Sequence, residues 1–168
     1  MRALGLLLLL AACAAPAPPV SAPPVSAPPV SAPPVPTPPA WARPDLAPAW
    51  LSAAGDIRWP PEDGFRGTAT PIILPPGVLL DRFGADTGRF LSPKGAAFRA
   101  RALPTACATQ PYSSFRVLTP LPVWIGRAAP WFDEPGGATQ VQTDATVKQL
   151  LDDGVLARLP AAAAAPCG

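Results

Sequence analysis

Residues 68–91 read TATPIILPPGVLLDRFGADTGRFL. Two short apolar runs, 68–74 and 78–83, are separated by a turn that contains two prolines and Gly77. Runs of this length between such turn residues are typical of β-strands. After a second turn, residues 88–91 predict a third short strand. The stretch therefore predicts a small β-sheet.

The rest of the folded part adds more short strands and one helix. Residues 113–118 alternate and are rich in β-forming side chains. Thr146, followed three residues later by Gln149, forms a capping-box pattern that begins a helix, and Gly154 ends it. Further strands are expected at 122–125, 140–142 and 155–156. We therefore expect an α+β domain with a small, twisted, antiparallel or mixed β-sheet and a few short helices.

The N-terminus has the features of an export signal. A positive charge precedes a leucine-rich run at 4–10, and Leu10-Ala11-Ala12-Cys13 resembles a bacterial lipobox. We therefore expect residues 1–12 to be removed as a signal peptide and Cys13 to carry a lipid that anchors the chain to a membrane. Ala14, rather than Asp, follows Cys13, which favours the outer membrane or the cell surface. The alternative is an ordinary secretory signal, cleaved among the same alanines, which gives a secreted protein.

A proline-rich segment follows the predicted signal. Thirteen of the 28 prolines of the chain lie before residue 45, and Pro-Pro-Val-Ser-Ala occurs three times in succession from Pro18. Paired prolines hold φ at about −65° and remove hydrogen-bond donors, so we expect residues 16–39 to form an extended polyproline II segment of about 75 Å. We predict a stalk over residues 13–44, a folded domain over 45–160 and an alanine-rich tail over 161–168.

Composition argues against several functions. The net charge is +2 and no run of Lys or Arg stands out, so we expect no nucleic-acid partner. The chain has no histidine, which excludes Ser–His and Cys–His catalytic triads and most zinc sites, and we expect no metal. Once Cys13 is lipidated, Cys107 and Cys167 remain. An even pair in an oxidising compartment predicts a disulfide.

A set of short motifs runs through the predicted domain in a definite order. They are Trp59-Pro60-Pro61 with Gly64-Phe65, Leu74-Pro75-Pro76-Gly77, Asp81-Arg82-Phe83-Gly84, Gly88-Arg89-Phe90-Leu91, Arg101-Ala102-Leu103-Pro104, Pro111-Tyr112, Pro135-Gly136-Gly137 with Thr139-Gln140, and Asp153-Gly154-Val155-Leu156. Over residues 59–157 this set resembles the tuberculosis necrotizing toxin (TNT) family of NAD glycohydrolases. The resemblance implies a compact β-sheet core, distantly related to ADP-ribosyltransferases, and hydrolysis of the nicotinamide–ribose bond of NAD. NAD is then the substrate, and no cofactor is implied.

The resemblance also implies roles for individual residues. Gln140 and Arg82 are the implied catalytic residues, and NAD-binding roles fall on Arg82, Phe90, Arg101 and Gln142. Gln142 is also the rival of Gln140 for the catalytic position, because both follow the Gly-Gly loop. At one position the chain departs from the family, since Ser113 stands where relatives often carry His.

These residue types suit the chemistry. Nicotinamide leaves a positively charged ring as a neutral molecule, so the step needs no general acid. An amide oxygen can face the positive charge that develops on the ribose. Guanidinium groups match pyrophosphate oxygens, and an aromatic ring can stack on a base. Two Arg, one Phe and one Gln are therefore sufficient without His.

Two other functions stay open. An ADP-ribosyltransferase usually relies on a glutamate near the ribose, and the chain has only Glu62 and Glu134, of which Glu134 is close in sequence to Gln140. A non-enzymatic surface module is the other possibility, in which Ser113 marks lost activity. The sequence does not indicate an immunity protein as a partner.

Overall fold

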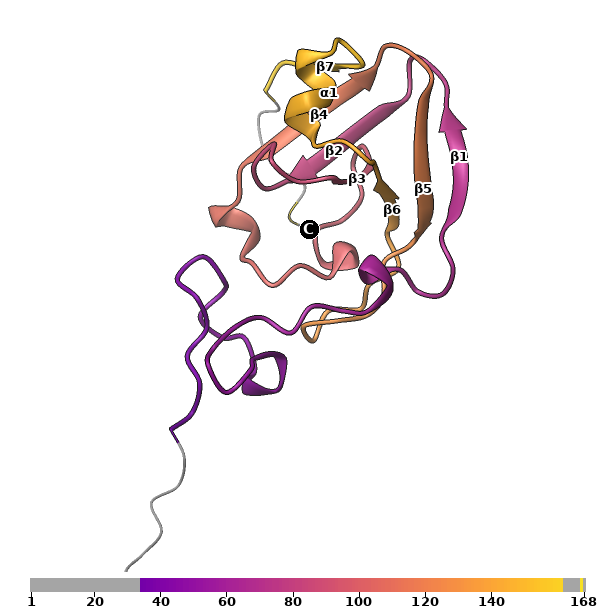
Figure 1. Cartoon of the computed structure of the whole chain (residues 1–168). Coiled ribbons are helices and arrows are strands. Elements are labelled where there is room, and N and C mark those ends of the chain that lie inside the picture. Colours follow the sequence, from indigo (N-terminus) through magenta and orange to yellow (C-terminus); the bar gives the residue numbers. More distant parts are fainter. Residues whose placement is uncertain (1–33, 162–166, 168) are drawn as a thin grey trace, which may run out of the picture. The chain divides into compact units, whose positions relative to one another are not determined.

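The computed structural model describes residues 34–161 and residue 167 (Figure 1). The predicted signal peptide, Cys13 and the three Pro-Pro-Val-Ser-Ala repeats lie outside the described residues. In the part that is described, no helix has the length and apolar character needed to cross a membrane.

Seven strands form one sheet in the order β1-β5-β6-β3-β2-β4-β7 (Figure 1). Their bounds are β1 Thr70–Leu74, β2 Leu79–Phe83, β3 Phe90–Pro93, β4 Tyr112–Val117, β5 Leu121–Arg127, β6 Thr139–Gln142 and β7 Leu156–Arg158. Every neighbouring pair is antiparallel. The expected small sheet is confirmed, and its described pairings are antiparallel rather than mixed.

The order of the strands differs from their order along the chain. β1 pairs with β5, in a register that runs from Thr70 opposite Ile125 to Leu74 opposite Leu121. β2 lies between β3 and β4 instead. The predicted turn between the first two strands is present, but Gly77, with φ of 95°, donates its N–H to the carbonyl of Val117. The turn therefore leads the chain away from β1 toward β4.

The helical parts are short. The predicted helix is confirmed as α1, Val147–Asp152, and its capping box between Thr146 and Gln149 is formed. Four 3-10 segments complete the described helical structure: η1 Pro48–Trp50, η2 Glu62–Gly64, η3 Arg99–Arg101 and η4 Cys107–Thr109. The chain returns to the sheet after Gly154, as predicted, and α1 lies beside the strand that it enters, β7.

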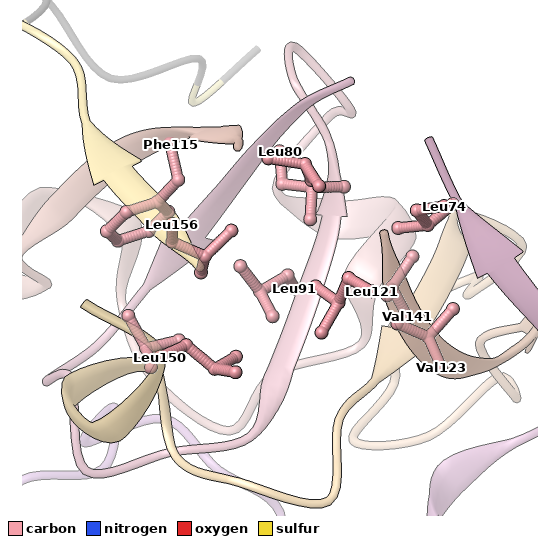
Figure 2. Close-up of a cluster of buried hydrophobic side chains, with 11 residues drawn as sticks. Leu74, Leu80, Leu91, Phe115, Leu121, Val123, Val141, Leu150 and Leu156 are labelled. Carbon is pink, nitrogen blue, oxygen red and sulfur yellow. The ribbon is translucent and has the colours of Figure 1, made fainter. Parts of the chain in front are cut away.

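The two faces of the sheet differ in polarity because successive side chains of a strand point to opposite sides. On one face, Leu80, Leu91, Phe115 and Val141 form a core with Leu150 of α1 (Figure 2). Residues next to these in sequence point to the opposite side, which we call the polar face: Asp81, Ser92, Ser114, Gln140 and Gln142. All of them except Gln140 are buried polar residues.

Residues 39–59 form a second apolar cluster with the loop around residue 132. Leu46 and Leu51 bury their side chains against Phe132. The Trp50 ring packs at 5.0 Å from that of Trp131, and both Trp50 and Trp59 contact the ring of Phe132 edge-on. This segment is therefore part of the folded unit.

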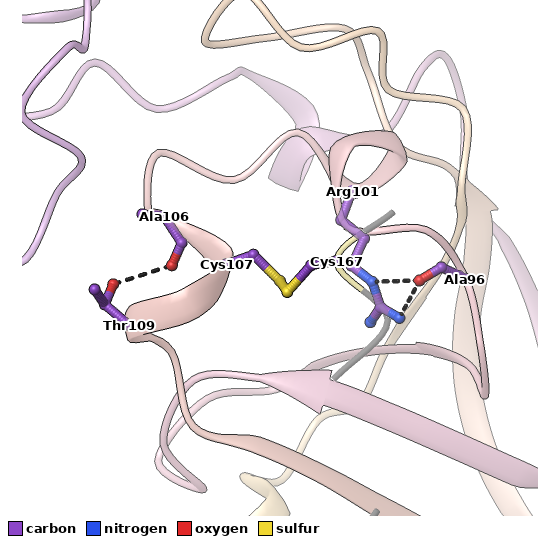
Figure 3. The surroundings of a disulfide bond; sticks show 6 residues. All are labelled: Ala96, Arg101, Ala106, Cys107, Thr109 and Cys167. Atoms are coloured by element: carbon purple, nitrogen blue, oxygen red, sulfur yellow. Dashed lines mark hydrogen bonds between the residues drawn. A yellow bond between two sulfur atoms is a disulfide. The ribbon is translucent and has the colours of Figure 1, made fainter. Parts of the chain in front are cut away.

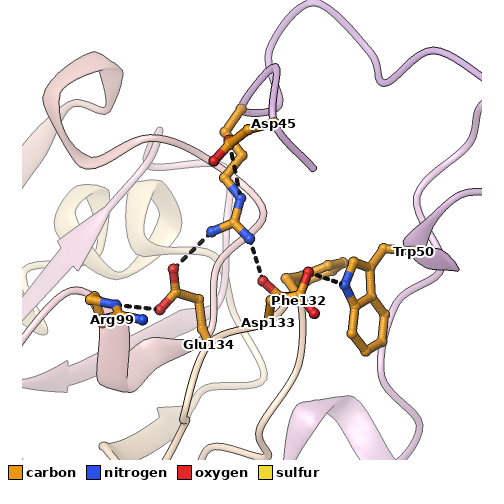
Figure 4. Close-up of polar contacts among 7 residues, drawn as sticks. Asp45, Trp50, Arg99, Phe132, Asp133 and Glu134 are labelled. Atoms are coloured by element: carbon orange, nitrogen blue, oxygen red, sulfur yellow. Dashed lines mark hydrogen bonds and ion pairs between the residues drawn. The ribbon is translucent and has the colours of Figure 1, made fainter. Parts of the chain in front are cut away.

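Contacts of this segment begin before the predicted domain start at residue 45. Arg43 Nη1 lies 2.7 Å from Glu134 Oε1, and Arg99 Nε lies 2.8 Å from Glu134 Oε2 (Figure 4). Arg43 also donates to the carbonyl of Phe132. Glu134 thus joins the segment that the sequence places in the stalk to η3.

The predicted disulfide is confirmed. Cys167 is bonded to Cys107 at the start of η4, and the two Cα atoms are 5.7 Å apart (Figure 3). The bond attaches residue 167 to the folded domain, 60 positions away along the chain.

Candidate functional site

Four of the five residues implicated by sequence line one small pocket at the polar face. The pocket has a volume of about 50 Å³. Its lining comprises Arg82, Phe83, Phe90, Leu91, Ser92, Arg101, Leu103, Ala128 and Gln140. These residues come from β2, β3, β6 and η3 and from the segments that follow η3 and β5. The fold therefore brings together residues that are up to 58 positions apart, Arg82 and Gln140 among them.

Arg82 is held by the loop that follows β2. Its Nε donates to the carbonyl of Ala85 at 2.9 Å and its Nη1 to that of Phe90 at 2.7 Å. Gly88 leaves the necessary space, since a Cβ at Gly88 would lie 1.8 Å from Arg82 Nη2. Burial lowers the pKa of Arg82, although the nearby Asp86 carboxylate acts in the opposite direction. Because a guanidinium ordinarily titrates far above neutrality, Arg82 stays a cation.

Arg101 belongs to a buried ion pair behind the pocket wall. Its Nη2 lies 2.6 Å from Oδ1 of Asp81, a fully buried carboxylate, and also donates to the carbonyl of Ala96 at 2.7 Å (Figure 3 shows the contact with Ala96). Its guanidinium also lies over the ring of Phe83, 4.9 Å from the centroid. Each buried charge here is paired, as a stable interior requires. Arg101 therefore has a structural role in this fold, and its binding of NAD stays a prediction.

The other oxygen of Asp81 organises the same region. Asp81 Oδ2 accepts hydrogen bonds from the Tyr112 hydroxyl and from the backbone N–H of Gly95, both at 2.8 Å. Burial raises the pKa of Tyr112, so its hydroxyl keeps the proton that it donates. One carboxylate thus connects β2 with β4 and with the loop after β3.

Gln140 and Gln142 lie on the same side of β6, because they are two residues apart in one strand. Gln140 lines the pocket. Gln142 is 7% exposed and stands opposite Phe90 of β3. Both glutamines therefore belong to the site, but only Gln140 reaches the pocket.

Sequence reasoning missed Asp63, which binds both glutamines. Gln140 Nε2 donates to the carbonyl of Asp63 at 2.9 Å, and Gln142 Nε2 donates to Asp63 Oδ2 at 3.1 Å. Asp63 has a left-handed backbone with φ of 51°. The one available signal was the Asp63-Gly64 pair, since both residue types are enriched in that conformation.

A larger hollow adjoins the pocket and has a volume of about 490 Å³. It is lined by Pro93, Lys94, Gly95, Ala96, Ala97, Ala100, Arg127, Gly136, Gly137, Ala138 and Thr139. Pro93, Arg127 and Thr139 are direct chain neighbours of residues that line the pocket. The hollow therefore lies near the pocket along these three segments, and its cationic residues are Lys94 and Arg127.

Ser113, where the chain departs from the family pattern, lies opposite Arg82 in the pairing of β4 with β2. Its Oγ accepts a hydrogen bond from Arg158, which also forms an ion pair with Asp86. Ser113 and Arg158 thus form a polar contact that joins β4, β7 and the loop that holds Arg82.

Residues 73–159 match the family described as tuberculosis necrotizing toxin. The chain belongs to the TNT family. This TNT-family chain is 39% identical over 132 residues to conidial surface nicotinamide adenine dinucleotide glycohydrolase nadA from Aspergillus fumigatus. That match covers 71% of the chain and 54% of the fungal protein, so the chain spans about half the length of this relative.

A solved structure supports the same fold. The structure of tuberculosis necrotizing toxin complexed with its immunity factor IFT matches with a TM-score of 0.52 and 25% sequence identity. The match covers 64% of this chain and 65% of the toxin chain. The antiparallel sheet described above is therefore a TNT fold.

Proposed function

We propose that this TNT-family chain is an NAD glycohydrolase, which hydrolyses NAD to nicotinamide and ADP-ribose. The observation that carries the proposal is that Arg82, Phe90 and Gln140 all line one pocket. The family match and the name of the fungal relative support the same reaction.

In the proposed reaction the bond between C1′ of the ribose and the nicotinamide nitrogen breaks. Its electron pair moves onto the ring nitrogen and neutralises the ring, so no proton has to be donated to the leaving group. Water adds to C1′ and releases a proton to solvent. The amide oxygen of Gln140 would face the positive charge on the ribose, an interaction that strengthens as the bond breaks.

The two hollows suggest how NAD would lie. The pocket of about 50 Å³ is far smaller than a dinucleotide, so we propose that the nicotinamide riboside end lies at its mouth, with the Phe90 ring against the base. Arg82 would bind the pyrophosphate. The adjoining hollow of about 490 Å³, with Lys94 and Arg127, would receive the adenosine end.

Transfer of ADP-ribose to a protein fits the site less well. The glutamate nearest in sequence to Gln140 is Glu134, whose side chain is 10% exposed and is bound by Arg43 and Arg99. A glutamate held by two cations is not free to contact ribose hydroxyls. We also propose that this sheet is distantly related to that of ADP-ribosyltransferases. That relation concerns ancestry and not the activity of this chain.

The test uses purified full-length protein and NAD labelled in its adenine ring. We expect nicotinamide and free labelled ADP-ribose to appear in equal amounts, and the folded Gln140→Ala variant to release much less of both. Label attached to protein would favour the transferase. A folded protein that releases no nicotinamide would refute the proposal.

Partner and location belong to the same proposal. The solved toxin is complexed with an immunity factor. A comparable inhibitor of this chain would have to cover the mouth of the pocket, so an inactive preparation should first be examined for a second protein. Lipid attachment at Cys13 would place the activity at the outer membrane or the cell surface.

A further inference from the structure

We infer that Asp63 and Gln142 are positioning residues that orient the amide of Gln140. The inference rests on the proposed function for the catalytic role of Gln140, whereas the hydrogen bonds that join the three residues do not depend on it. Gln142 then anchors the catalytic amide through Asp63 and does not compete with Gln140 for the same role.

The unit consists of two hydrogen bonds that meet at one residue. The backbone carbonyl of Asp63 accepts from Gln140 Nε2 at 2.9 Å, and its carboxylate accepts from Gln142 Nε2 at 3.1 Å. Gln142 is 7% exposed and lies in the strand, so it is a rigid point of attachment. The carboxylate bond therefore holds residue 63 in place, and its carbonyl holds Gln140.

These bonds also determine which way the Gln140 amide faces. A carbonyl and a carboxylate can only accept hydrogen bonds, so each glutamine must turn its NH₂ group toward Asp63. Gln140 Oε1 is then on the far side of the amide, and it accepts no hydrogen bond from any residue in 34–161 or from residue 167. An amide rotated by half a turn would present NH₂ to the substrate, which is the wrong polarity for a developing cation.

The residues that follow Asp63 are hydrogen-bonded to the C-terminal end of β5 and to the segment after it. Ala129 N–H donates to the carbonyl of Gly64 at 2.8 Å, and Arg66 N–H donates to that of Arg127 at 2.7 Å. The Phe65 ring covers Gly126, where a Cβ would lie only 2.7 Å from the ring. The left-handed backbone at the tip is unfavourable for non-glycine residues and persists because these contacts hold it.

Glu62 is a matched control for Asp63. It precedes Asp63, has nearly the same backbone angle, with φ of 52°, and makes no side-chain hydrogen bond with the described residues. Glu62→Ala therefore reproduces the backbone effect of Asp63→Ala without removing an acceptor from the glutamines.

The first test detects the hydrogen bonds by NMR and does not depend on enzymatic activity. In ¹⁵N–¹H spectra of the full chain, the variants Gln140→Ala and Gln142→Ala identify the two side-chain NH₂ signals. Asp63→Ala should shift both signals and speed the hydrogen exchange of the Gln142 signal, whereas Glu62→Ala and Asp63→Asn should leave both near their original positions. Unchanged signals in Asp63→Ala would overturn the inference.

The second test separates positioning from direct contact with NAD. Asp63→Ala and Gln142→Ala should each lower kcat about tenfold with KM changed less than about twofold, and the double variant should be no worse than either single one. Asp63→Asn, which keeps an acceptor oxygen, should recover most of kcat. Neither Asp63→Ala nor Gln142→Ala should lower kcat further when Gln140 is already Ala. Additive losses, or losses mainly in KM, would overturn the inference.

These tests distinguish failure of the inference from failure of the proposed function. If Asp63→Ala fails to fold, Asp63→Gly replaces it, because glycine adopts the left-handed backbone readily and still removes the carboxylate. If the NH₂ signals respond as expected but no variant, including the unmodified chain, hydrolyses NAD, the proposed function fails while the hydrogen-bonded unit stands. If NAD is hydrolysed but the signals do not respond, the inference alone fails.

Discussion

Gly88 leaves free the space that the Arg82 guanidinium occupies. A Cβ at this position would lie 1.8 Å from Arg82 Nη2 and 2.2 Å from Cζ. The obstacle is the end of a flexible side chain, so Gly88→Ala should fold and push Arg82 away from the carbonyls of Ala85 and Phe90. We expect KM for NAD to rise at least about fivefold, with the melting temperature little changed.

The control is the same change where no obstacle exists. In an Arg82→Ala background the Cβ at position 88 has nothing to displace, so Gly88→Ala should have no further effect on KM. An equal loss in both backgrounds would show that Gly88 acts on NAD binding independently of Arg82.

The variants Arg82→Ala and Gln140→Ala should change different kinetic constants. Arg82 would bind the pyrophosphate in ground and transition states alike, so its loss should raise KM more than it lowers kcat. Gln140 would face charge that develops only during bond breaking, so its loss should lower kcat at least about tenfold. Steady-state kinetics of the two folded variants measures this, and the reverse pattern would contradict the assignment of roles.

At the scale of elements, the N-terminus of α1 supports the loop that holds Arg82. The N–H groups of Val147 and Lys148 donate to the carbonyls of Gly88 and Asp86 at 3.0 and 2.8 Å, and that of Gln149 donates to Thr146 Oγ1 at 3.2 Å. These are donors that a helix leaves without partners in its first turn. The helix and the loop therefore complete each other's hydrogen bonding.

Loss of the cap should be measurable as stability. Thr146→Ala removes the acceptor for the Gln149 N–H, and we expect the free energy of unfolding to fall by about 1 kcal/mol. Thr146→Ser keeps the hydroxyl and should be close to the unmodified chain. Chemical denaturation followed by circular dichroism measures both, and equal stability of all three proteins would contradict the role of the cap.

At the scale of the whole molecule, the Cys107–Cys167 bond closes a loop with a sequence separation of 60. In the chain-entropy model such a bond stabilises by about 4 kcal/mol, because it restricts the unfolded chain. The double variant Cys107→Ser/Cys167→Ser should therefore unfold at lower denaturant concentration. Peptide mapping without reducing agent should recover the two cysteines linked, and free thiols in protein from the cell envelope would contradict the pairing.

Membrane attachment through Cys13 is a separate prediction. We expect Cys13 to incorporate labelled palmitate and the protein to partition into detergent, because the leucine run ends in Leu10-Ala11-Ala12-Cys13. Cys13→Ser should release soluble protein or stop processing, without altering NAD hydrolysis by the folded domain. Normal export without incorporation of label would refute the lipid anchor.

Much of the site could be predicted because it lies in short motifs. Arg82, Phe90 and Gln140 stand in recognisable surroundings, and the structure brings all three to one pocket. Asp63 could not be found in this way, since its partner Gln140 is 77 residues distant and an aspartate in a loop has no pattern of its own. The same holds for the burial of Arg101, which depends on its ion pair with Asp81.

The amino-acid sequence alone determined the features that neighbouring residues encode: the strands and turns, the capping box at Thr146, the proline-rich segment and the even pair of cysteines. Only the tertiary structure decided that β1 pairs with β5 and not with β2, and that Arg43 meets Glu134 across 91 residues. The physical reason is that an alternating apolar pattern specifies which face of a strand is buried but not which strand lies beside it. That choice comes from the packing of the whole core, and it brings Asp63 over the two glutamines at the site that we propose for NAD.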